Sequence, residues 1–265
     1  MIRVVSAAAL IALLVVTVWW LPPVAIISLA VLTAALGAVE LVGLARASGA
    51  VVPAPLVALL AAAVCFLGSY GTGDVRPLLV AGLVAVAVLI ITGRAPDRTT
   101  ITRAAVVMGG PVYLGLPLAL IVGISVDYGP HGVSTLALMV IVSDSAQYFA
   151  GRAFGRRKLA PLISPAKTIE GAIGGVIASA AVGAWLINWA RPDSTIEATM
   201  AGGAMVGAAV AIAGMLGDLF ESALKRGAGV KDSSALIPGH GGVLDRIDSW
   251  LFAGPVFSLF LRYFV

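Results

Sequence analysis

The sequence predicts an all-α, polytopic integral membrane protein with about nine transmembrane helices and a cytoplasmic N-terminus. Composition is the first observation behind this fold class: 60% of the 265 residues are hydrophobic and 11% are charged, and the mean hydropathy is +1.05. Soluble domains carry roughly 25% charged residues, so this chain has too few polar side chains to cover a water-soluble globule. A soluble enzyme, a disordered chain and a disulfide scaffold are therefore excluded, which leaves a helical membrane protein.

Apolar stretches of spanning length are the second observation. A spanning helix needs about 20 mostly apolar residues, and Arg3 precedes the first such stretch. Because no small-residue cleavage site precedes Pro22 and Pro23, we interpret this stretch as a span and not as a signal peptide. The nine predicted spans cover residues 4–20, 24–45, 51–69, 77–93, 104–125, 132–151, 171–190, 199–219 and 248–264.

The distribution of basic residues is the third observation. With nine spans, the N-terminus and every second loop lie on one side of the membrane, and 14 of the 17 Lys and Arg residues fall there. Excess Lys and Arg collects on the cytoplasmic face, so this side is predicted to be cytoplasmic in a multi-pass cell-membrane protein. The net charge of +4 is interpreted in the same way, and no nucleic-acid partner is predicted. The other side holds Arg76, Arg191 and Arg262.

Two further features concern packing. Cys65 is the single cysteine and lies in an apolar run, so we interpret it as a small core residue. Small residues recur at four-residue spacing in the seventh and eighth spans, and such residues let helix backbones approach closely in lipid. We expect this ridge to pack within the monomer, with a homodimer interface as the alternative. Its members are Gly171, Gly175, Ser179 and Gly183 in one span and Gly203, Gly207 and Ala211 in the next.

Charged residues concentrate in two predicted cytoplasmic loops, 152–170 and 220–247, which together hold 13 of the 30 charged residues. Several acids also lie in or beside spans, among them Asp144 inside the sixth, Asp218 at the end of the eighth and Asp248 at the start of the ninth. A charge at the centre of a spanning helix costs about 2.5–3.5 kcal/mol. Each acid alone could be an ion-paired or interfacial group, whereas their clustering near one membrane face favours a functional site.

The spacing of the acids indicates the kind of site. Four polar residues have the spacing i, i+3, i+4 and i+7: Asp218, Glu221, Ser222 and Lys225. This spacing places them on one face if the helix continues past the membrane. Asp245 and Asp248 are three residues apart and would share a face at the start of the ninth span. Carboxylates from two helix ends repel one another unless a cation lies between them, and oxygen ligands of this kind suit Mg²⁺.

Glycines and basic residues separate these acids in segments 225–232 and 238–242. Glycine lets a backbone approach a ligand closely and present amide groups to an anion, while Lys and Arg add positive charge against phosphate. The combination is typical of a metal–polyphosphate site. In the other loop, Ser164 and Pro165 predict an N-cap and the first helical residue. Beside them, Lys167 and Thr168 form either an anion pocket or an ordinary helix start.

The same segments resemble the signature of a known family. The runs Ser222-Ala223-Leu224-Lys225-Arg226, Lys231-Asp232-Ser233-Ser234 and Ile237-Pro238-Gly239-His240-Gly241-Gly242-Val243-Leu244-Asp245-Arg246-Ile247-Asp248 resemble the signature of the phosphatidate cytidylyltransferases, the CDP-diacylglycerol synthases. The resemblance covers residues 143–248, whereas residues 1–103 are similar only in being apolar helices. It departs at Gln147 and Ala166, where the family more often has a small residue and a Lys. The upstream elements that agree are Ser143-Asp144, Tyr148, Gly151-Arg152, Lys158-Leu159-Ala160-Pro161, Ser164-Pro165, Lys167-Thr168 and Glu170-Gly171.

The resemblance implies a reaction in which CTP and phosphatidic acid give CDP-diacylglycerol and pyrophosphate. It also implies a monovalent cation such as K⁺ as a companion to Mg²⁺. The expected Mg²⁺ ligands are Asp218 and Asp245, supported by Asp248 and Asp144. The expected catalytic residues are Asp218, Asp245, Lys225 and Arg246. The residues expected to bind CTP or phosphatidate are Lys167, Thr168, Ser222, Arg226, Lys231, His240, Gly241 and Gly242.

Two other functions stay open at this point. Another membrane nucleotidyl- or phosphotransferase, acting on a lipid phosphate or a polyprenyl alcohol, would also use acids and basic loops at the membrane face. A secondary transporter would also contain intramembrane acids, but transporters often show inverted repeats and none is evident in this sequence. As domains, residues 1–103 are predicted to form N-terminal transmembrane helices for scaffolding or lipid access, and residues 104–265 the catalytic region.

Overall fold

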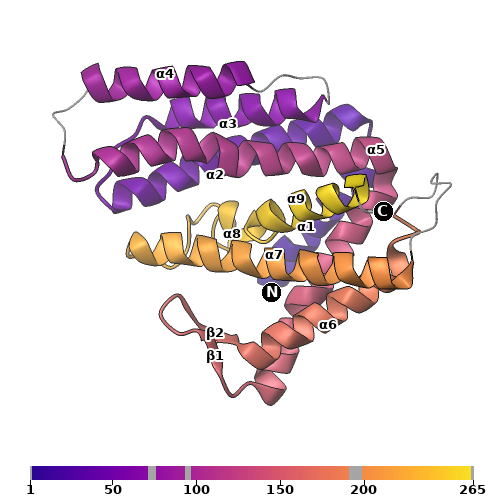
Figure 1. The fold of residues 1–265 in the computed structure, drawn as a ribbon. Coiled ribbons are helices and arrows are strands. Elements are labelled where there is room, and N and C mark those ends of the chain that lie inside the picture. Colours follow the sequence, from indigo (N-terminus) through magenta and orange to yellow (C-terminus); the bar gives the residue numbers. More distant parts are fainter. Residues whose placement is uncertain (1, 71–75, 93–96, 191–198, 264–265) are drawn as a thin grey trace. The chain divides into compact units, whose positions relative to one another are not determined.

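Helices make up almost all of the regular structure in the residues that are described. The computed structural model describes residues 2–70, 76–92, 97–190 and 199–263 (Figure 1). Arg94 and Arg191, which entered the charge count, lie outside these ranges. The helices are α1 Ile2–Trp19, α2 Pro23–Ala47, α3 Ala54–Ser69, α4 Arg76–Thr92, α5 Thr100–Phe154, α6 Ile169–Leu186, α7 Met200–Gly227, α8 Leu244–Ile247 and α9 Trp250–Tyr263, and the strands are β1 Lys158–Ala160 and β2 Ser164–Thr168.

Each predicted span coincides with a helix or with half of one. The predicted spans 104–125 and 132–151 are the two halves of α5, which breaks at Gly129, where φ is 65° and ψ is −162°. Gly129 precedes Pro130, and a residue before proline is pushed out of the helical region, so the break is expected there. α7 continues beyond the predicted end at residue 219 to Gly227. Part of the predicted loop 220–247 is therefore helical.

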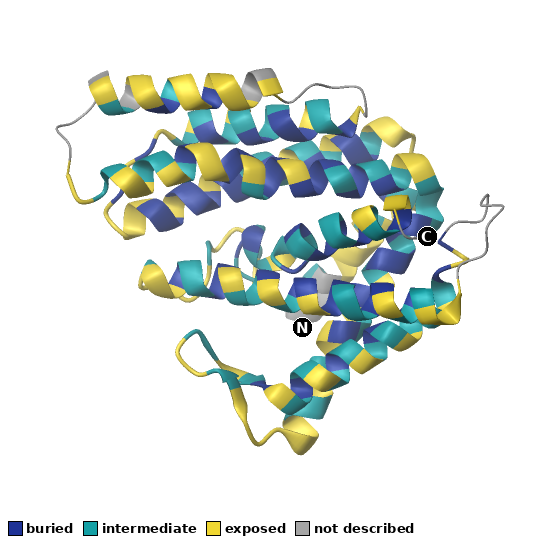
Figure 2. Ribbon diagram, in the orientation of Figure 1, coloured by how far each residue is buried: buried dark blue, intermediate teal, exposed yellow. Residues whose placement is uncertain are grey.

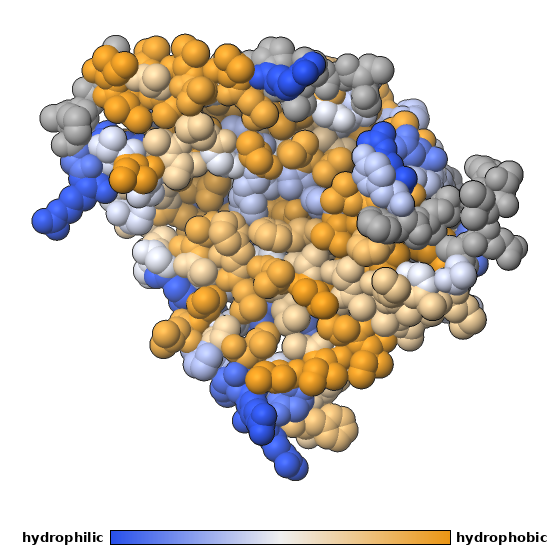
Figure 3. All heavy atoms as spheres, viewed as in Figure 1, coloured by the Kyte–Doolittle hydropathy of each residue, from blue (hydrophilic) through white to orange (hydrophobic). Residues whose placement is uncertain are grey.

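Length and composition identify several of these helices as membrane segments. Among the described residues, α2, α5, α6 and α7 are long and apolar enough to cross a membrane, and shorter apolar helical stretches cover Ala8–Trp19, Ala54–Ser69 and Leu79–Val88. Along α4, hydrophobic side chains such as Leu83 and Ile91 are exposed, and Figures 2 and 3 show this exposed hydrophobic face. A surface of this kind is stable against lipid and not against water. In its described residues the chain is therefore an all-α membrane protein apart from the short hairpin of β1 and β2.

Contacts divide the chain into two compact units. The first unit is Met1–Gly123 with Leu224–Ile247, and the second is Ile124–Ala223 with Asp248–Val265. The predicted division at residue 103, between helices for scaffolding or lipid access and a catalytic region, is one of function and stays a prediction. By contacts, residues 224–247 belong to the same unit as the N-terminal helices. A part of the predicted catalytic region is thus built on the helices that precede it.

Close helix packing builds the core of the first unit. Pro23 occupies the first turn of α2, where its fixed φ suits a helix start. α2 packs against α3. A Cβ at Gly115 of α5 would lie 2.6 Å from the backbone oxygen of Ala61 in α3, so glycine is what lets these two helices approach. Cys65 is fully buried in α3, which confirms that it is a core residue.

The predicted ridge of small residues packs inside the second unit. All four of its members in α6 are buried, and Ser179 Oγ donates to the carbonyl oxygen of Gly207 in α7 at 2.8 Å. A Cβ at Gly171 would lie 2.6 Å from the backbone oxygen of Gln147 in α5. Packing within the monomer is confirmed, and a homodimer would need a different surface as its interface.

The start of α6 differs from the prediction. Ser164 and Pro165 do not cap the helix but lie in β2, which pairs antiparallel with β1 and places Ser164 opposite Ala160. Pro165 lacks an N–H, which suits a strand of a two-stranded ribbon with an unpaired edge. The cap is Thr168, whose Oγ1 accepts a hydrogen bond from the Gly171 N–H at 3.1 Å.

The ninth predicted span also starts later than expected. α8 ends at Ile247, a turn at Asp248 and Ser249 follows, and α9 begins at Trp250. Asp248 Oδ1 accepts a hydrogen bond from the Ser249 N–H at 2.6 Å, a local bond that competes with helical backbone pairing. The prediction that Asp245 and Asp248 share one helical face is therefore wrong.

Candidate active site

Residues 228–243, called the signature loop below, join α7 to α8 within the first unit. Gly229, Gly239 and Gly241 have φ values of 72°, 78° and 77°, which glycine adopts without steric cost. The Ile237 N–H donates to the carbonyl oxygen of Gly241 at 2.8 Å and closes the tight turn around Gly239. Glycine therefore sets the path of this loop, and the loop is packed by groups from its own unit.

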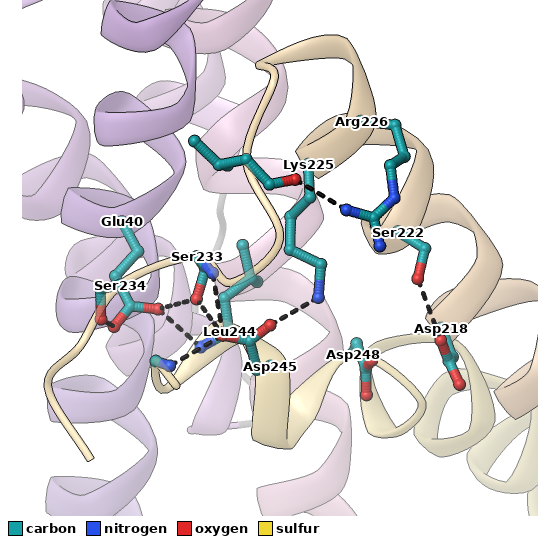
Figure 4. A network of polar contacts seen from close by, with 12 residues as sticks. Glu40, Asp218, Ser222, Lys225, Arg226, Ser233, Ser234, Leu244, Asp245 and Asp248 are labelled. Carbon is teal, nitrogen blue, oxygen red and sulfur yellow. Dashed lines mark hydrogen bonds and ion pairs between the residues drawn. The ribbon is translucent and has the colours of Figure 1, made fainter. Parts of the chain in front are cut away.

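Asp245 lies at the centre of the polar contacts of the signature loop (Figure 4). Its Oδ1 lies 2.5 Å from Lys225 Nζ of α7. Its Oδ2 accepts hydrogen bonds from the Ser233 N–H at 2.9 Å, from Ser233 Oγ at 2.7 Å and from the Gly242 N–H at 2.7 Å. The side chains of Asp245 and Lys225 are 5% and 10% exposed, so this is a buried ion pair.

These contacts decide the protonation state of Asp245. Burial alone would raise the pKa of its carboxyl group, but the Lys225 ammonium and the donors of Gly242 and Ser233 outweigh burial and lower the pKa to about 2. The carboxylate is therefore ionised at neutral pH, and Lys225 supplies the balancing charge. An ionised carboxylate held in one orientation is suited to binding a cation or aligning a positively charged side chain.

Glycine is required at two positions where the signature loop passes close to the carboxylates of Asp245 and of Glu40 in α2. A Cβ at Gly241 would lie 2.6 Å from Asp245 Oδ2, and a Cβ at Gly242 would overlap Ser233 Oγ and Glu40 Oε2. The Gly242 N–H is directed at Asp245. Both glycines were predicted to bind a substrate, and that stays a prediction; in the structure they let the loop pack around its carboxylates.

Sequence reasoning missed one residue of this cluster. Glu40 lies in α2, is 6% exposed, and accepts hydrogen bonds from Ser233, Ser234, Val243 and Leu244. The available signal was an acid inside an apolar span, because such an acid is costly in lipid unless it is paired. α2 therefore contributes a hydrogen-bonded carboxylate to this unit as well as apolar surface.

A second cluster of charged residues lies in the second unit. Lys167 Nζ lies 2.6 Å from Asp218 Oδ2, and Ser222 Oγ, one turn along α7, donates to Asp218 Oδ1 at 3.3 Å. Asp144 of α5 interacts electrostatically with both Lys167 and Asp218, and it accepts a hydrogen bond from Gln147 Nε2 at 3.3 Å. Lys167 thus interacts with carboxylates from two different helices, with Asp218 by direct contact and with Asp144 electrostatically.

The remaining predicted site residues have other partners or lie at the surface. Arg226 Nη1 donates to the carbonyl oxygen of Val230 at 2.9 Å. His240 Nδ1 lies 2.7 Å from Ser6 Oγ of α1, within the first unit. Exposed basic side chains in or beside the signature loop are Arg226, Lys231 and Arg246.

The side-chain atoms that could bind a metal in the two units are carboxylate and hydroxyl oxygens, and Mg²⁺ prefers oxygen ligands. Among the described residues, no three His, Cys, Asp or Glu side chains gather as a metal site. The two acids predicted as principal ligands each hold an ammonium instead: Lys225 on Asp245 and Lys167 on Asp218. These oxygens fit a cation, which would compete with lysine for them.

Comparison with known proteins extends the resemblance beyond these residues. A family model described as the cytidylyltransferase family matches residues 1–264. The phosphatidate cytidylyltransferase of Haemophilus influenzae is 47% identical over 133 residues, which are 49% of this chain and 46% of that protein. The phosphatidate cytidylyltransferase of Staphylococcus haemolyticus is 38% identical over 165 residues, 62% of each chain. That of Thermotoga maritima is 36% identical over 183 residues, 68% of this chain and 67% of that protein.

The extent of the match differs between the family model and the individual relatives. The chain spans about half the length of several curated relatives that it matches. The family model, in contrast, covers nearly every residue, including α1 to α4 and both charged clusters. The chain therefore belongs to the cytidylyltransferase family.

Proposed function

We propose that this protein transfers the cytidylyl group of CTP to phosphatidic acid, giving CDP-diacylglycerol and pyrophosphate. The family model over residues 1–264 supports this proposal, as do relatives in three bacteria that are named phosphatidate cytidylyltransferase. The observation that carries it is the buried cluster in which Asp245 contacts both Lys225 and Gly242, all three of them predicted site residues.

The proposed reaction is an in-line displacement at the α-phosphorus of CTP. An oxygen of the phosphatidate phosphate forms the new bond, the bond to the bridging oxygen of the β-phosphate breaks, and pyrophosphate leaves with that electron pair. Two anions must meet, so positive side chains are needed to offset their repulsion. The residues that we assign this role are Lys167, Lys225, Arg226, Lys231 and Arg246. Hydrogen bonds to the substrates are assigned to Thr168, Ser222, His240, Gly241 and Gly242.

Mg²⁺ is the proposed cofactor, with a monovalent cation such as K⁺ as its companion. The proposed ligands are Asp218 and Asp245, supported by Asp144 and Asp248. When bound, a divalent ion neutralises phosphate oxygens as charge develops on them. Since Lys167 is paired with the more exposed of the two principal acids, Asp218, a cation bound by that carboxylate would leave the Lys167 ammonium available to substrate phosphates.

We also propose nine membrane spans, with the N-terminus and the two charged loops on the cytoplasmic side. The 14 basic residues that fall on that side support this orientation. It brings water-soluble CTP to the loops while phosphatidate stays in the membrane. A cysteine placed at Leu162, which is 93% exposed, in a Cys65→Ser background would test the orientation. Labelling from the cytoplasmic side alone is expected, and labelling from the outside alone would contradict it.

Product analysis tests the proposed reaction directly. Purified protein with phosphatidic acid, CTP and Mg²⁺ is expected to form CDP-diacylglycerol and pyrophosphate in equal amounts. Asp218→Asn and Asp245→Asn are each expected to lower turnover by about 100-fold or more. Asp127→Asn changes an exposed acid of α5 outside the proposed site, and this matched control is expected to keep wild-type turnover.

Three outcomes would contradict parts of this proposal. Uptake of a labelled solute into proteoliposomes without CTP, and without a nucleotide product, would indicate a transporter. Transfer from CTP to a polyprenyl alcohol, with none to phosphatidate, would indicate a different membrane transferase. Near-normal turnover in both carboxylate variants would remove these acids from the metal assignment.

A further inference from the structure

Glu40 connects α2 to the signature loop and α8 within the first unit (Figure 4). Its Oε1 accepts hydrogen bonds from Ser234 Oγ at 2.7 Å and from the Val243 N–H at 2.9 Å. Its Oε2 accepts from Ser233 Oγ at 2.9 Å and from the Leu244 N–H at 2.8 Å. Each oxygen therefore binds one hydroxyl and one backbone N–H, and two separate parts of the 233–244 segment are held by one carboxylate.

This arrangement requires a carboxylate. An ionised carboxylate accepts hydrogen bonds at both oxygens, whereas an amide of the same shape has one acceptor oxygen and one NH₂ donor. A serine hydroxyl can rotate away from a donor, but the backbone N–H groups of Val243 and Leu244 cannot. In either orientation of the amide that Glu40→Gln introduces, the NH₂ group would face one of these N–H groups and leave that donor without its acceptor.

Ser233 and Gly242 extend the contacts of Glu40 to Asp245. Ser233 Oγ lies 2.9 Å from Glu40 Oε2 and 2.7 Å from Asp245 Oδ2, so its hydroxyl lies between the two carboxylates and can donate its one proton to either. A Cβ at Gly242 would overlap Glu40, and the Gly242 N–H donates to Asp245. Glu40 thus fixes in place the groups that in turn orient Asp245.

We propose that Glu40 is a positioning residue, which holds the signature loop and the start of α8 so that Asp245 and Lys225 keep the orientation needed for cytidylyl transfer. This inference rests on the proposed function, because it gives Asp245 a part in that reaction. Glu40 does not touch the reacting groups and acts through Ser233 and Gly242. It gives α2 an indirect role in the site, through the loop that Glu40 holds.

Two substitutions at Glu40 separate hydrogen bonding from filling of space. Glu40→Gln keeps the shape and loses acceptors, whereas Glu40→Asp keeps the acceptors and loses a methylene. We expect Glu40→Gln to lower kcat by about tenfold or more, to change the KM for CTP by less than about twofold, and to be less active than Glu40→Asp. A space-filling role predicts the reverse order of the two variants, and that order would overturn the proposal. Asp127→Asn is the matched acid-to-amide control.

Hydrogen–deuterium exchange gives a readout that does not depend on the reaction. In Glu40→Gln we expect faster exchange in residues 231–247 and unchanged exchange in α3. Unchanged protection of residues 231–247 would overturn the proposal. A wild-type protein that forms no CDP-diacylglycerol would instead overturn the proposed function, and faster exchange in the variant would still support the contact between Glu40 and the loop.

Ser234→Ala provides the test if Glu40→Gln does not insert or fold. This change removes one hydroxyl donor to Glu40 Oε1 and leaves the spanning helix untouched. We expect kcat to fall about threefold and exchange in residues 231–247 to rise. Wild-type kcat together with wild-type exchange in Ser234→Ala would overturn the proposal.

Discussion

Two lysine–aspartate pairs in the described part of the chain differ in how firmly they are held. In the first unit, Asp245 and Lys225 are 5% and 10% exposed, and Ser233 and Gly242 also donate to the carboxylate. In the second unit, the side chains of Asp218 and Lys167 are 32% and 19% exposed. Breaking a buried pair is costly, whereas a more exposed pair contributes little to stability. The Lys225–Asp245 pair is therefore rigidly held. Asp218, in contrast, can exchange the Lys167 ammonium for another cation at little cost in folding free energy.

Asp245→Asn is expected to have the largest effect of any change in either pair. The amide would leave the buried Lys225 ammonium without its counter-charge, and breaking such a pair costs about 3–5 kcal/mol. We expect a lower Tm together with the 100-fold or greater loss of turnover. Thermal unfolding and turnover are to be measured on the same detergent-solubilised sample. A wild-type Tm would show that this pair is not the firmly held one.

Asp218→Asn is expected to lower activity strongly and stability only slightly. We expect a loss of turnover similar to that of Asp245→Asn, but a change in the free energy of unfolding below about 1 kcal/mol, because the pair with Lys167 is partly exposed. The same unfolding measurement checks this. A fall in stability as large as that of Asp245→Asn would remove the distinction between the two pairs.

Much of the fold was predictable because a spanning helix depends on local composition. Twenty apolar residues in lipid form a helix whatever their distant neighbours are, since backbone groups must bond within the segment. The start of α6 was not predictable in this way. Ser164 and Thr168 are both good N-cap residues, and the pairing of β1 with β2, which selects Thr168, is a tertiary feature. The break between α8 and α9 was missed for another reason: it coincides with a local hydrogen bond from the Ser249 N–H to Asp248, which the hydrophobic pattern does not indicate.

The candidate site was predictable in its members but not in its contacts. The resemblance indicated Lys225 and Asp245, which are 20 residues apart, without indicating that they pair. Glu40 and Ser233 are 193 residues apart, and no local pattern connects a helix near the N-terminus to a loop near the C-terminus. Contacts over such separations are set by helix packing. For this reason the first unit's carboxylate network became visible in the structure and not in the sequence.

Gly242→Ala tests the close packing around the Lys225–Asp245 pair and Glu40 without removing a charge. The new Cβ would overlap Ser233 Oγ and Glu40 Oε2, which are both held by hydrogen bonds and have little room to move. We expect about a tenfold loss of kcat and a loss of stability of about 1–3 kcal/mol. Gly227→Ala is the matched control, because a Cβ there meets nothing within 4 Å, and it is expected to keep wild-type turnover. Equal effects of the two substitutions would contradict the close packing around Glu40.

Thr168→Ala concerns the residue next to Lys167 and carries the smallest expected effect. Thr168 Oγ1 accepts the Gly171 N–H at 3.1 Å, and loss of such a cap costs about 1 kcal/mol. Accepting this bond leaves the hydroxyl proton free to be donated to a phosphate, so the cap and the predicted substrate contact are compatible. We therefore expect Thr168→Ala to lower stability and to raise the KM for CTP, and Thr168→Ser to restore both. If stability falls and the KM for CTP does not change, the Thr168 hydroxyl is only a helix cap. Phosphate binding in the second unit would then rest on Lys167 and not on Thr168.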